Sequence, residues 1–123
     1  MNRNPLKAYK NIEKATISGR ATEARVLNKA AQKLKYCQDN WMSVSSNNKD
    51  RLEKALRFNQ RIWSIFQSEL ARDENPLPVN LKRDILSLSA FIDKRIFEIM
   101  ACPEKEKLTA LIKINQNIAA GLS

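Results

Sequence analysis

The chain has 123 residues, a length typical of a single domain with one hydrophobic core, and its 2 glycines and 4 prolines are too few for a fold rich in strands and turns. Residues 1–61 hold 14 basic and 5 acidic side chains, whereas residues 62–123 hold 8 of each, so the first half carries the whole net charge of +9. This asymmetry favours an acidic protein surface or a phosphate backbone as a neighbour. The absence of an apolar run of about 20 residues excludes a transmembrane helix, and we expect a cytoplasmic protein without membrane insertion.

The first predicted helix begins at Pro5 and ends near Ser18 and Gly19. Proline suits the first helical position, and apolar residues recur at helical spacing after it. A second helix is predicted from Thr22 to about Met42. Its apolar stripe consists of Ala24, Leu27, Ala31, Leu34 and Trp41.

The segment from Ser43 to Asn48 is the clearest break, because Ser and Asn side chains compete for backbone hydrogen bonds. A third helix is predicted from Lys49 to Arg72. Its broad apolar side consists of Leu52, Leu56, Ile62, Trp63, Phe66 and Leu70. Two prolines between Asp73 and Pro78 then stop the helix.

The fourth predicted helix ends at the Cys102-Pro103 junction, because the residue before a proline avoids helical angles. Its apolar stripe consists of Leu81, Ile85, Leu88, Ile92, Ile96 and Ile99, widened by Leu86 and Phe91. A fifth helix is predicted from Pro103 to Gly121, with Glu104 and Glu106 in its first turn. The sequence therefore predicts an all-α fold: residues 1–123 form a single compact bundle of about five helices with short connections.

Residue types that carry out catalysis or bind metals are missing. The chain has no histidine, and its two cysteines, Cys37 and Cys102, are far apart in sequence, which argues against a zinc site. No nucleophile with an acid and a base is visible, and glycine is too rare for a phosphate-binding loop. We expect no enzymatic activity, no cofactor, no metal and no small-molecule substrate.

Basic side chains form stripes along three of the predicted helices. Such stripes are either an electrostatic footprint for RNA or an acidic protein, or simply a solvated outer face. Exposed aromatic residues and a recognition helix, which nucleic-acid modules usually present, are not evident. The stripes consist of Lys7, Lys10 and Lys14; of Arg25, Lys29 and Lys33; and of Lys54, Arg57 and Arg61.

Asn59 and Asn115 lie on or beside apolar stripes, where an amide side chain is costly unless it finds partners. Each either fixes the register of the helices in the core or contacts a binding partner. Trp41 and Trp63 are open to the same two interpretations, because a large aromatic residue at helical spacing is either core or an interface anchor.

Several segments together resemble the flagellar biosynthesis regulator family FlaF, and the resemblance covers almost the whole chain. No single segment is diagnostic, but their order and spacing make the resemblance strong. They are Ala8-Tyr9, Arg20 to Glu23, Ala55-Leu56, Asn59 to Ser64, Leu77-Pro78, Ile85 to Ile92 and Leu111 to Leu122.

The resemblance implies a cytoplasmic regulator of motility that promotes flagellin production or export, acting with the regulator FlbT and binding flagellin like a chaperone. Flagellin has terminal amphipathic segments, and a helical groove could shield one of them. We expect an apolar binding surface of Trp63, Phe66, Leu70, Ile118 and Leu122, with polar contacts from Asn59, Arg61 and Asn115.

Two alternatives remain open at this point. The first is direct binding of flagellin mRNA by the basic half, with Arg25, Lys29, Lys33, Lys54 and Arg57 as phosphate or acidic-surface contacts. The second is a structural adaptor that docks FlbT and forms no binary complex with flagellin.

Overall fold

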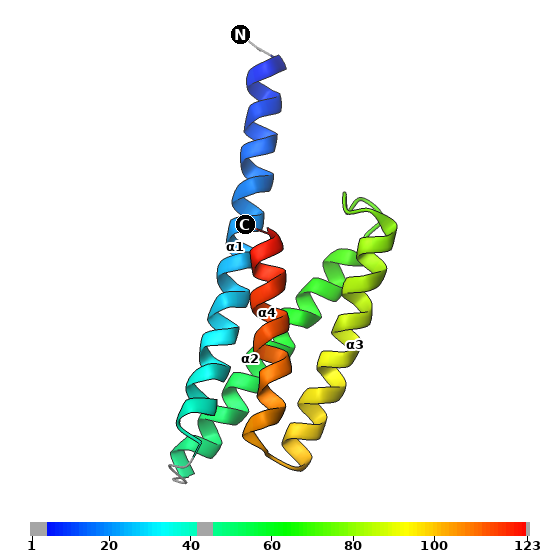
Figure 1. Cartoon of the computed structure of the whole chain (residues 1–123). Helices are drawn as coiled ribbons and strands as arrows, with labels where there is room; N and C mark the ends of the chain where they lie inside the picture. Colours follow the sequence, from blue (N-terminus) through cyan, green and yellow to red (C-terminus); the bar gives the residue numbers. More distant parts are fainter. Residues whose placement is uncertain (1–4, 42–45, 123) are drawn as a thin grey trace.

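The computed structural model describes the backbone of residues 5–41 and 46–122, and the side chains of residues 22–41 and 48–121. These ranges contain four α-helices, one short 3-10 helix and no strand (Figure 1). The elements are α1 (Pro5–Asp39), α2 (Ser46–Leu70), α3 (Val79–Ala101), η1 (Lys105–Lys107) and α4 (Leu108–Leu122). The all-helical fold class is confirmed, whereas the expected number of five helices is too high by one.

The expected break near Ser18 and Gly19 is wrong, because α1 continues through both residues as a single helix of 35 residues. A lone glycine inside a helix costs only about 1 kcal/mol relative to alanine, and no proline is nearby to block the backbone hydrogen bonds. The first part of α1 extends well beyond the end of α4 (Figure 1).

The expected start of the last helix at Pro103 is also wrong. Cys102 and Glu104, on either side of this proline, have φ angles of −143° and −141°, far from helical values. The chain then makes the 3-10 turn η1 before α4 begins at Leu108. Glu104 and Glu106 therefore lie outside α4, and Gly121 lies within its last turn.

The first and last helices lie side by side, and α2 crosses beside them (Figure 1). α3 runs back along α2, packs mainly against it, and makes only a few contacts with α4. The molecule thus consists of two parts: α1 and α4, which are far apart in sequence and pack side by side, and a helical hairpin of α2 and α3. One side of α3 has no neighbouring helix (Figure 1).

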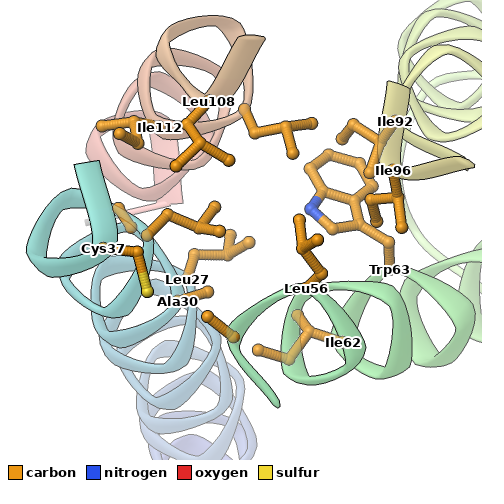
Figure 2. Close-up of a cluster of buried hydrophobic side chains, with 14 of the residues drawn as sticks. Leu27, Ala30, Cys37, Leu56, Ile62, Trp63, Ile92, Ile96, Leu108 and Ile112 are labelled. Atoms are coloured by element: carbon orange, nitrogen blue, oxygen red, sulfur yellow. The ribbon is translucent and has the colours of Figure 1, made fainter. Parts of the chain in front are cut away.

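The core lies where these helices meet, and it is aliphatic apart from Trp63 and a few polar groups. Leu27, from α1, faces Leu108 and Ile112, from α4, as Figure 2 shows. The ring of Trp63 lies between α2 and α3, next to Ile92 and Ile96 (Figure 2). Burial of these side chains is the main source of stability, because each contributes roughly 1.5–3 kcal/mol.

Candidate protein-binding surface

Asn59, Trp63 and Asn115 form a hydrogen-bonded chain inside the core, and all three are fully buried. The indole Nε1 of Trp63 donates to Oδ1 of Asn115 at 2.8 Å, and Nδ2 of Asn115 donates to Oδ1 of Asn59 at 2.5 Å. The polar contacts that we expected these asparagines to make with a partner are made within the protein, between α2 and α4. Of the two interpretations, the structure supports the core one.

The other members of the expected surface are dispersed. Phe66 is half-buried against Trp63, with ring centroids 5.6 Å apart, and Ile118 packs partly buried against the core. Leu70 is buried at the end of α2, whereas Arg61 is exposed. The side chain of Leu122 lies outside the described residues. The members whose side chains are described do not form one accessible surface.

The basic residues of α1 and α2 whose side chains are described are exposed, but several already have partners. Lys54 pairs with Asp50 at 3.0 Å and Arg57 with Glu53 at 2.6 Å, each one turn apart on α2. The ammonium group of Lys33 lies 5.0 Å from the centre of the Phe58 ring.

Within the predicted basic stripes, three residues whose side chains are described have neither an ion pair nor an aromatic partner. Arg25, Lys29 and Arg61 are exposed and make no ion pair with any residue whose side chain is described. The side chains of Lys7, Lys10 and Lys14 lie outside the described residues.

A feature that the sequence did not predict is an apolar stripe on the solvent side of α3. We call it the α3 stripe, and its residues follow one another at intervals of 7, 4, 7 and 3, which places them on one helical face. Phe97 is 74% exposed and Val79 is 70% exposed, values far above those of core residues. The α3 stripe consists of Val79, Leu86, Ala90, Phe97 and Met100.

At its N-terminal end the α3 stripe forms one wall of an open groove of about 530 Å³. The end of α2 supplies the other wall through Leu70, so the groove lies where the hairpin turns. Its lining is mostly apolar, with Lys82 and Arg83 at the rim. This shape and chemistry suit the apolar face of a helix from a partner.

Three residues expected to complete the core stripe of this helix are partly exposed instead. Leu81 is 42% exposed, Leu86 is 38% exposed and Phe91 is 39% exposed. The prediction for these residues was wrong because α2 and α4 cover only the face of α3 that carries Ser89, Ile92, Ile96 and Ile99. The spacing of Val79, Leu86, Ala90 and Phe97 was visible in the sequence as a second, out-of-phase stripe, and it could have revealed this surface.

The cysteines differ in environment. Cys37 is buried and Cys102 is exposed, and both are free thiols. Burial raises the pKa of the Cys37 thiol above its ordinary value, although Arg51 and Lys33 partly oppose this shift. Among the described residues no three His, Cys, Asp or Glu side chains come together as a possible metal site.

The described helices also lack the combination of length and apolar character that crossing a membrane requires.

Fold and surface together define a class: a small all-helical protein in which one helix face lacks a partner. The family model described as flagellar protein FlaF matches residues 5–122. The chain belongs to the FlaF family and is a flagellar protein, as the resemblance implied. No curated protein and no solved structure matches the chain significantly.

Proposed function

We propose that this FlaF protein binds an amphipathic helical segment of flagellin in the cytoplasm and keeps it soluble for export, in cooperation with FlbT. The observation that carries the proposal is the open apolar groove between the end of α2 and the start of α3. An exposed apolar face on a small protein is costly unless a partner covers it for part of its working cycle.

The groove takes over the role that we first gave to Trp63 and its neighbours. Of the residues expected to bind the partner, Leu70 lines the groove, whereas Asn59 and Asn115 are hydrogen-bonded to each other in the core and join α2 to α4. A flagellin segment that buries its apolar face only inside the filament would find here a temporary apolar environment.

The experiment is a binding titration of purified full-length protein with monomeric flagellin, followed by a filament assembly assay. We expect a stable complex on size-exclusion chromatography and slower assembly of flagellin in its presence. The Leu86→Glu variant should lose both effects, because it places a carboxylate in the groove. Lys113→Glu, which also introduces a carboxylate but at an exposed position on α4 outside the groove, is the control. Absence of a complex between the wild-type protein and flagellin contradicts the proposal.

A second candidate, direct binding of flagellin mRNA, is favoured by the unpaired cations Arg25, Lys29 and Arg61. Binding through phosphates should weaken steeply as salt rises, because bound counterions are released from the nucleic acid. A gel-shift titration with flagellin leader RNA tests it. Weakened binding by Arg25→Ala/Lys29→Ala supports this candidate, and no affinity at low salt removes it.

A further inference from the structure

We propose that the whole α3 stripe is a docking face for an amphipathic helix whose apolar side is flanked by acidic residues. The inference rests on the proposed function for the source of that helix, flagellin, but it adds the site and the chemistry of the occupant. Its two supports are the length of the apolar stripe and the charge of its borders.

The apolar part of the argument concerns length. From Val79 to Met100 the α3 stripe spans about 32 Å at 1.5 Å per residue, far beyond the groove at its N-terminal end. Phe97 and Met100 lie near the other end of the helix and are exposed. A helix of about six turns laid along α3 would cover all of these residues, whereas a short loop or a small molecule would cover only the groove.

The electrostatic part concerns the residues beside the stripe. Lys82, Arg83 and Lys94 lie one to four positions from stripe residues, and Lys82 and Arg83 also line the groove. None of the three forms an ion pair with a residue whose side chain the structure describes. Three cations without counterions beside an apolar stripe favour an occupant with carboxylates on both flanks.

The three acidic residues of α3 offset this charge only in part. Asp84 is exposed, and it precedes Phe91 by seven residues, which places it on the Phe91 side of the helix and not on the α3 stripe. Asp93 accepts a hydrogen bond from Nε2 of Gln67 on α2 at 3.4 Å. Glu98 lies 3.6 Å from the guanidinium group of Arg95, which itself lies over the Phe91 ring. The Phe91 side of α3 is therefore a separate face, turned about 100° from Ala90.

The first test uses two designed helical peptides of 22 residues that share an apolar stripe and differ in having either glutamate or lysine on both flanks. We expect the glutamate peptide to bind the full-length protein at least ten-fold more tightly than the lysine peptide in low salt. Leu86→Ala/Phe97→Ala should weaken its binding at least ten-fold. Phe91→Ala, an exposed aromatic on the other face of α3, is the matched control and should change binding less than two-fold.

A second variant separates charge from apolar contact. Lys82→Glu/Arg83→Glu/Lys94→Glu keeps the α3 stripe intact and should reverse the preference, so that the lysine peptide binds more tightly. All three side chains lie outside the core, and circular dichroism confirms the helical content of each variant. Equal affinity of the wild-type protein for the two peptides overturns the inference, and so does an effect of Phe91→Ala equal to that of the double variant.

Flagellin itself distinguishes the inference from the proposed function. If flagellin binds the wild type and Leu86→Ala/Phe97→Ala equally well, the α3 stripe is not the site and the inference fails while the proposed function stands. If the glutamate peptide binds with the expected specificity but flagellin does not bind, the inference stands and the proposed function fails.

Discussion

The buried side chain of Asn59 has a hydrogen-bond partner for only one of its two polar atoms. Its Oδ1 accepts the hydrogen bond from Asn115, but its Nδ2 is buried and has no hydrogen-bond partner in the structure. A buried donor of this kind costs roughly 1–3 kcal/mol. The asparagine pair therefore contributes less to stability than its short contact suggests, and its clearer effect is to fix how α2 and α4 align.

Replacing Asn115 by alanine should destabilise the fold by about 2–4 kcal/mol, because it leaves both the Trp63 indole and Oδ1 of Asn59 without partners. Chemical denaturation monitored by Trp fluorescence measures this change. Asn117→Ala, an exposed position on the same helix, should stay within about 0.5 kcal/mol of wild type. Equal effects of the two variants would mean that the buried chain contributes nothing to stability.

The two thiols should react at very different rates. Cys102 is exposed, whereas Cys37 is buried and its raised pKa keeps the thiol neutral in the folded state. A thiol-specific reagent at neutral pH should label Cys102 rapidly and Cys37 only on unfolding, as mass spectrometry of digested protein will show. Equal rates would contradict the burial of Cys37.

The same shift has a defined effect on stability. Above the ordinary pKa of about 9.0 the unfolded chain releases the Cys37 proton while the folded chain retains it, so the free energy of unfolding falls as pH rises. Wild type should therefore lose more stability than Cys37→Ala between about pH 8 and pH 10.

At the scale of elements, α3 has two apolar faces with different roles. Ile96 is 2% exposed and packs in the core, while the next residue, Phe97, belongs to the α3 stripe. Ile96→Ala should destabilise the fold by about 2–5 kcal/mol, because it leaves a cavity. Phe97→Ala should change stability by less than about 1 kcal/mol. Thermal unfolding of both variants makes the comparison, and a large loss for Phe97→Ala would show that its ring is covered.

The sequence predicted the end of a helix correctly where the residues there block the helical backbone, and less well where they only weaken it. Pro76 and Pro78 separate α2 from α3 as expected, since a proline removes a backbone donor and restricts its neighbour. Gly19 is a weaker signal for a helix end, and the helix propensity of the residues around it outweighs it. At the other end, Pro103 was read as the start of a helix, although only the structure shows that η1 comes first.

The site was harder to predict than the fold for a physical reason. Helical spacing places Trp63 and Phe97 each on an apolar face, but it does not reveal which face another helix covers. That depends on contacts between segments far apart in sequence, such as Trp63 with Asn115. The sequence alone therefore identified the family and the apolar residues, whereas the packing of α2, α3 and α4 against one another decided which of these residues a partner can reach.

At the scale of the whole molecule, stability should be uneven. α1 and α4 pack closely against each other, whereas the first turns of α3 contact little besides the end of α2. Hydrogen exchange followed by mass spectrometry should show slow exchange in the buried parts of α1 and α4, and faster exchange near Leu81 and Leu86. Uniform protection along all four helices would contradict this expectation. Slower exchange in α3 on adding flagellin would locate the partner.

The pairing of α1 with α4 also has a consequence for protein synthesis. Leu27, Ala30, Ala31 and Leu34 are almost completely buried, yet much of what covers them comes from α4, which the ribosome makes after α1, α2 and α3. The apolar side of α1 in the nascent chain therefore stays uncovered until α4 has been made. A premature stop codon in place of Leu108 would remove α4 and leave a product that degradation machinery can recognise.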